Sequence, residues 1–113
     1  MQHQFERALE RGDATHAIAT AKQMGGLSLG NALALCVVLA ERDPDRFRRA
    51  APRWLSRFLE ECENVSIEEA QLVSAALAAL PTAAYLARPV LRELVEARRL
   101  VTVKRIFADV VRA

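Results

Sequence analysis

Arginine is the residue whose spacing first points to chemistry in this chain. Five arginines follow one another at intervals of four, three, four and four: Arg42, Arg46, Arg49, Arg53 and Arg57. On an α-helix, which turns about 100° per residue, these steps place the five side chains on one face, here called the arginine row. Guanidinium groups bind carboxylates and phosphates in a bidentate manner. The row therefore predicts a binding surface for an acidic protein or a nucleic acid.

A second group of basic residues lies near the end of the chain. It consists of Arg88, Arg92, Arg98, Arg99, Lys104 and Arg105. Asp43, Asp45, Glu93 and Glu96 lie among the two groups and lower their potential, and the net charge is only +2. The excess of Arg over Lys, together with abundant Ala, is also typical of a GC-rich genome. The charge pattern thus favours a solvated face or an acidic protein partner over a nucleic acid.

Residues that support catalysis are sparse. No Ser or Cys stands at a motif spacing from His3 or His16. Cys36 and Cys62 show neither metal-ligand spacing nor a disulfide framework. The acidic residues between 60 and 69 have ordinary helix roles, with Glu60 predicted to pair with Arg57 one turn away. We therefore predict no catalytic residue, no cofactor-binding residue and no metal ligand.

The element that carries the arginine row is predicted as a helix from residue 44 to residue 61. Asp43 is suited to cap it, and Pro44 fits its first position, where a missing N–H costs nothing. The face away from the row is apolar and contains Phe47, Ala51, Trp54 and Phe58. Pro52 lies inside this helix and predicts either a kink or a break. A break would also interrupt the arginine row.

A helix over residues 29–41, capped by Ser28, is predicted to form the centre of the molecule. Residues 33–40 are all apolar, so this helix has almost no polar face. A helix that is apolar all round is a buried one. We expect the aromatic face of the 44–61 helix to pack against it.

Shorter helices are predicted over residues 2–11, 14–24, 67–80 and 89–99, with a short helical turn at 82–87. A final helix is predicted over 100–111, either separate from the 89–99 helix or continuous with it, although residues 100–103 also favour a β conformation. Asp13 is suited to cap the second helix, and Ser66 and Glu69 form a capping box before the 67–80 helix. The apolar side of the 67–80 helix is predicted to comprise Leu72, Val73, Ala76, Leu77 and Leu80. The apolar stripe of the final helix comprises Leu100, Val103, Ile106, Phe107 and Val110. This stripe is predicted either to pack in the core or to form the contact surface of a homodimer. The fold class is all-α, a single domain over residues 1–113 of six or seven short helices, arranged as an orthogonal bundle or as stacked helical hairpins.

Two segments resemble known helical proteins. Residues 10–24, with their Gly12-Asp13 corner, are similar to the hairpins of tetratricopeptide-like proteins. Together with residues 42–58, they also resemble small helical proteins common in actinobacteria. Both resemblances imply an all-α fold, and neither implies an activity or a functional residue. Residues 9–13 and 40–44 are similar to each other at a spacing of 31 residues, which hints at stacked hairpins.

The sequence predicts a cytoplasmic protein that binds another protein. Its start lacks the basic and apolar regions of a signal peptide, and its longest apolar run, residues 27–40, is too short to cross a bilayer. The leading hypothesis is a non-enzymatic protein–protein interaction module whose partner is an unidentified protein or a second copy of this chain. The contact residues it proposes are Arg46, Arg49, Arg53 and Arg57. The alternative is a small nucleic-acid-associated regulatory protein that uses both basic groups.

Overall fold

The computed structural model describes residues 1–107, apart from the side chain of Lys104. Six α-helices and one 3₁₀-helix follow one another in this part of the chain, which contains no β-strand. They are α1 (Gln2–Glu10), α2 (Ala14–Gln23), α3 (Leu29–Arg42), α4 (Pro44–Glu61), α5 (Ile67–Ala79), α6 (Ala84–Ala97) and η1 (Lys104–Phe107). The prediction of an all-α domain is confirmed.

Four helices begin at the capping residues that the sequence predicts. Asp13 accepts a hydrogen bond from the backbone N–H of His16 at 3.0 Å, and Asp43 accepts one from that of Arg46 at 3.3 Å. Ser28 caps α3 and Ser66 caps α5 in the same way, at 3.2 and 3.0 Å. Each cap satisfies one of the N–H groups that a helix start leaves without a partner.

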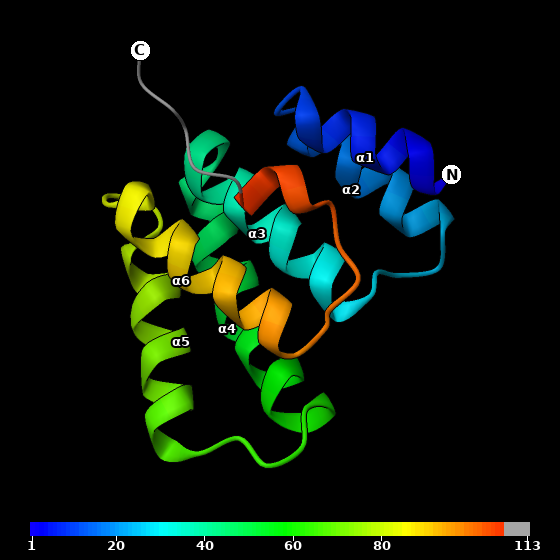
Figure 1. Ribbon diagram of the computed structural model, residues 1–113. Coiled ribbons are helices and arrows are strands. Elements are labelled where there is room, and N and C mark those ends of the chain that lie inside the picture. Colours follow the sequence, from blue (N-terminus) through cyan, green and yellow to red (C-terminus); the bar gives the residue numbers. More distant parts are fainter. Residues whose placement is uncertain (108–113) are drawn as a thin grey trace.

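The centre of the molecule is α3, as predicted. Ten of its residues are buried, among them Leu33, Val37 and Leu39. Consecutive helices form three hairpins, α1–α2, α3–α4 and α5–α6. Figure 1 shows α1 and α2 on one side of α3, and α5 and α6 on the other. This arrangement agrees with the stacked hairpins that the sequence leaves as one of two alternatives.

The two corners with similar sequences lie side by side. The guanidinium group of Arg42, at the end of α3, packs over Gly12 in the turn between α1 and α2. A side-chain carbon at Gly12 would come within 2.6–2.8 Å of that group. Gly12 also has φ +73°, a conformation that favours glycine. Glycine at this position therefore serves both the turn and the contact between the first two hairpins.

Helix α4 is continuous through Pro52. Pro52 lies on the exposed side of α4, as does Arg48, whose carbonyl loses its helical hydrogen bond. That carbonyl lies on the solvent side of the helix, where a water O–H can donate the hydrogen bond that Pro52 cannot. Of the two predicted alternatives, a kink or a break, the break does not occur, and the helix runs over the whole predicted length from Pro44 to Glu61.

Helix α6 begins at Ala84, five residues before Pro89. The prediction of a new helix opening at Pro89 after a short turn is therefore wrong. Pro89 lies in the second turn of α6, and the carbonyl that loses its hydrogen bond belongs to the exposed residue Tyr85. Pro89 itself is half-buried, so the exposure of Tyr85 is what leaves this carbonyl near solvent.

Residues 100–103 form an irregular strap and not the helix predicted there. Arg99 follows α6 in the left-handed conformation, with φ 54°, and turns the chain back over α3. The hydroxyl of Ser28 donates to the carbonyl of Val101 at 3.2 Å, and that of Thr102 donates to the carbonyl of Gly30 at 2.8 Å. Val103 and Phe107 are buried. The prediction for Val110 falls outside the described residues.

Helix lengths and composition also bear on membranes. Within residues 1–107, no helix combines the length and the apolar character needed to cross a bilayer.

Candidate functional site

Four of the five arginines of the predicted arginine row lie on α4. Because α4 is continuous, Arg46, Arg49, Arg53 and Arg57 lie along one side of a single helix. Arg42 does not belong to this helix, since it ends α3 and packs over Gly12. The predicted five-residue row is thus a row of four, away from the buried Phe47, Trp54 and Phe58.

Ion pairs occupy the two ends of this row. Arg46 Nε lies 3.4 Å from Asp43 Oδ2, and Arg57 Nε lies 2.7 Å from Glu61 Oε2. The prediction that Arg57 pairs with Glu60 is wrong, because Arg57 instead pairs with Glu61, which lies four residues along and one helical turn away. Arg49 and Arg53 are exposed and have no carboxylate partner within residues 1–107.

Three arginines of the second basic group pair with carboxylates on other helices. Arg88 Nη2 pairs with Glu41 Oε2 at 3.1 Å, and Arg105 Nη1 pairs with Glu10 Oε2 at 3.1 Å. Arg98 pairs with Glu69. These pairs tie α6 to α3, η1 to α1, and the end of α6 to the start of α5. These three arginines therefore join helices, and the use of the second basic group to bind a nucleic acid stays a prediction.

Arg98, at the end of α6, contacts α4, α5 and the loop between them. Its Nε donates to Glu69 Oε2 at 3.0 Å, and its Nη2 donates to the other Glu69 oxygen. Its Nη1 donates to the carbonyl of Glu63 at 2.6 Å, and its guanidinium carbon lies 5.9 Å from the centre of the Phe58 ring. Hydrogen bonding to Arg98 lowers the pKa of Glu69, and the same pair raises the pKa of Arg98. Both groups stay charged at neutral pH and join α4, α5 and α6.

Catalytic groups are not assembled in the described residues. His16 Nδ1 lies at the surface, 3.5 Å from Arg11 Nη2 and 3.9 Å from Asp13 Oδ2. Burial raises the pKa of the Cys36 thiol to about 12, and burial is also the main cause that raises the pKa of Cys62. Neither thiol is poised as a nucleophile, because nucleophilic cysteines have a lowered pKa. Within residues 1–107, no three His, Cys, Asp or Glu side chains come together as a metal site.

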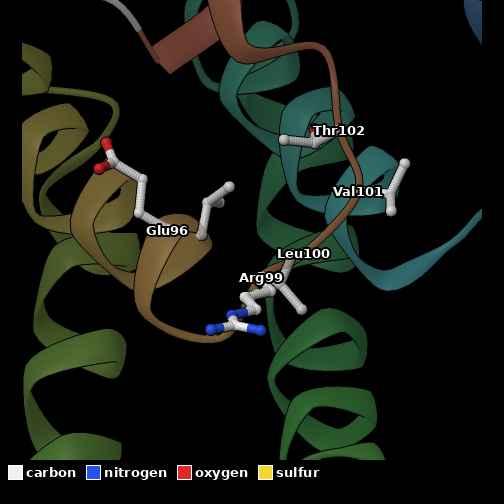
Figure 2. Close-up of a pocket in the computed structure, with 6 residues that line it drawn as sticks. Glu96, Arg99, Leu100, Val101 and Thr102 are labelled. Carbon is white, nitrogen blue, oxygen red and sulfur yellow. The ribbon is translucent and has the colours of Figure 1, made fainter.

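An open depression of about 540 Å³ lies where α6 meets the strap. Its walls are formed by Val95, Glu96, Arg99, Leu100, Val101 and Thr102. Figure 2 shows the Glu96 carboxylate and the Arg99 guanidinium group pointing in different directions. The hydroxyl of Thr102 is already bonded to Gly30. The depression therefore offers no convergent set of polar groups for a small ligand.

The side of α5 that faces solvent is apolar, which the sequence reasoning missed. Ile67 is 75% exposed and Leu72 is 56% exposed, although Leu72 was predicted on the buried side. Val73, Ala76 and Leu77 form the buried side instead. The exposed residues, here called the outer face of α5, are Ile67, Glu68, Gln71, Leu72, Ser74, Ala75 and Ala78. The available signal was that Ile67 and Leu72 lie off the stripe of Val73, Ala76, Leu77 and Leu80.

Comparison with protein-family models, with curated proteins and with solved structures finds no match for this chain.

Proposed function

We propose that this chain is a non-enzymatic protein–protein interaction module and that the outer face of α5 binds its partner. The observation that carries the proposal is the exposure of Ile67 and Leu72, at 75% and 56%, on a helix whose opposite side is buried. A helix that is apolar on both sides is normally covered on both sides. A partner protein would supply the missing cover.

The energetics favour such a partner. Burying one Ile or Leu side chain contributes about 1.5–3 kcal/mol, and exposed side chains contribute none of this to folding. Glu68 is the single charged residue of the outer face of α5, so covering the face removes little charge from water. Large exposed apolar patches mark interaction sites in soluble proteins, and Ile67 and Leu72 are the two large apolar side chains that this face exposes.

Two further large side chains are exposed at the start of α6, near the end of α5. Tyr85 is 77% exposed and Leu86 is 60% exposed. They follow the end of α5 after a short connection, residues 80–83, within the same hairpin. Tyrosine is enriched in interfaces because its ring is apolar and its hydroxyl remains hydrogen-bonded. A partner that covers α5 would therefore also reach this end of the hairpin.

The arginine row supports the same function more readily than nucleic-acid binding. Arg49 and Arg53 are free to bind the carboxylates of a protein. Nucleic-acid binders commonly contact about six to ten phosphates, and two free guanidinium groups neutralise only two. Since Arg88, Arg98 and Arg105 are engaged in ion pairs, they add little to a surface for phosphates.

Affinity capture from the source cells tests the proposal. The tagged chain is compared with a double variant, Ile67→Ser with Leu72→Ser, and with Val101→Ser, which changes an equally exposed residue outside α5. We expect the wild-type chain and Val101→Ser to retain the same protein and the double variant to lose it. Circular dichroism verifies that all three are folded. Retention of the same protein by the double variant, or of no protein by the wild type, would contradict the proposal.

A further inference from the structure

Helix α4 presents a second surface, on the side away from the core. Six exposed residues make up this surface, here called the outer stripe: Arg49, Pro52, Arg53, Ser56, Leu59 and Glu60. Their steps of three and four residues place them on one side of α4, opposite Phe47, Trp54 and Phe58. The same steps are typical of the seam along which two helices pack in a coiled coil.

The charges of the outer stripe are free and separated along the helix. Arg49 and Arg53 lie toward its start and Glu60 toward its end, and none of the three has an ion-pair partner in the described part of the chain. Charged residues beside the stripe do have partners. Arg48 pairs with Asp45, and the pairs of Arg46 and Arg57 are given above.

A stripe that is positive at one end and negative at the other complements a second copy of itself in the antiparallel direction. We propose that two copies of this chain associate through α4, with Arg53 of each copy paired with Glu60 of the other. In this register Leu59 packs on Pro52 of the other copy, and the small Ser56 lies at the two-fold axis. Arg49 then approaches the exposed Glu63 of the other copy. Every residue of the outer stripe has a complementary neighbour, as a two-fold interface requires.

The association expected from one helix per copy is weak and depends on salt. Stable interfaces bury about 800 Å² on each partner, more than one 18-residue helix presents on one side. Ion pairs at such a surface are screened as ionic strength rises. The dimer should therefore form at high protein concentration and low salt, and it does not involve the outer face of α5.

A charge exchange tests this inference by sedimentation velocity over a concentration series at low salt. Arg53→Glu places two acidic groups opposite each other in the proposed dimer, and Glu60→Arg places two basic groups there. We expect each variant to weaken self-association at least tenfold. An equimolar mixture of the two variants restores both ion pairs and should associate as the wild type does. Lys22→Glu, an exposed change on α2, serves as the control and should leave association unchanged.

Two results would overturn the inference: a wild-type chain that stays monomeric at the highest concentration, or a mixture that associates no better than its components. Neither result bears on capture through Ile67 and Leu72, because both charge variants leave α5 intact. Conversely, a double variant of α5 that loses its partner should still dimerise. The inference about α4 and the proposed function can thus fail independently.

Discussion

At the scale of the residue, Trp54 bonds α4 to α3 and packs within α4 against Phe58. Its indole Nε1 donates a hydrogen bond to the carbonyl of Leu29 at 2.8 Å. Its ring stacks on Phe58, with 5.4 Å between ring centres and 12° between planes. Trp54 is 2% exposed. The stacked pair therefore combines apolar burial with a satisfied polar atom, the combination that buried tryptophans need.

Substitution of Trp54 separates these contributions. Trp54→Ala leaves a large cavity and should lower the free energy of unfolding by about 3–5 kcal/mol. Trp54→Phe keeps most of the ring but loses the bond to Leu29, and it should cost about 1–2 kcal/mol. Urea unfolding followed by circular dichroism measures both. A loss below about 1 kcal/mol for Trp54→Ala would contradict a buried Trp54.

The pair of Glu69 and Arg98 predicts a dependence on pH. Because Arg98 lowers the pKa of Glu69 in the folded state, the pair stabilises the fold above the unfolded pKa of about 4.3. This contribution is lost as the pH falls through the lowered folded-state pKa. Glu69→Gln should therefore reduce the free energy of unfolding by roughly 1–2 kcal/mol at neutral pH. The difference from the wild type should shrink below about pH 4.

Glu68→Gln is the matched control for this measurement, since Glu68 is also in the first turn of α5 but has no ion pair within residues 1–107. Urea unfolding between about pH 7 and pH 3 compares both variants with the wild type. A gap for Glu69→Gln that does not change with pH, or that equals the gap for Glu68→Gln, would show that the pair with Arg98 contributes nothing.

At the scale of the element, the strap depends on a glycine in α3. A side-chain carbon at Gly30 would lie 2.9 Å from the carbonyl carbon of Val101 and closer still to its oxygen. The bonds from Ser28 and Thr102 hold the strap at this distance. The strap therefore owes its position to the close approach that only glycine permits.

Gly30→Ala should destabilise the protein although alanine is the better helix former. In a free helix this change stabilises by about 1 kcal/mol. Here the backbone of the strap must move, and we expect a net loss of about 1–3 kcal/mol. Ser74→Ala, on the outer face of α5, is the control and should be neutral or slightly stabilising. Unfolding in urea gives the sign, and a Gly30→Ala variant as stable as the wild type would refute the close contact.

Elements whose ends depend on residues nearby in the sequence could be predicted. Elements whose conformation depends on residues that are distant in the sequence could not. The caps Asp13, Ser28, Asp43 and Ser66 act on the next turn of the chain, so the helix starts that follow them were correct. The conformation of residues 100–103 depends on Ser28 and Gly30, more than 70 residues earlier, which periodicity does not reveal. Likewise, Pro52 predicts that one backbone hydrogen bond is lost, but the sequence does not show that the carbonyl concerned lies on the solvent side of α4.

The candidate site was predictable to a similar degree. The spacing of Arg46, Arg49, Arg53 and Arg57 indicates a common face and the structure places them on one helix. The spacing does not show which of these arginines lack an ion-pair partner, because Arg57 pairs with Glu61 and not with the predicted Glu60. The outer face of α5 was missed because an apolar helix does not indicate which of its sides the rest of the chain covers.

At the scale of the whole molecule, the α1–α2 and α5–α6 hairpins flank the α3–α4 hairpin (Figure 1), and two outward surfaces are left without cover in the described chain. One is the charged outer stripe of α4, and the other is the outer face of α5. In arrays of stacked hairpins, the terminal unit usually carries a polar outer side that ends the array. The α5–α6 hairpin, with Ile67, Leu72 and Tyr85 exposed, has the apolar character of a unit that packs against something further.

Hydroxyl-radical footprinting inside the source cells tests directly whether a partner covers α5. Labelling of Ile67 and Leu72 is measured by mass spectrometry in the cells and in the purified protein, with the exposed Val101 as the internal reference. We predict clearly lower labelling of Ile67 and Leu72 in the cells, with Val101 unchanged. Equal labelling of all three residues in both settings would contradict the claim that the outer face of α5 is a binding surface.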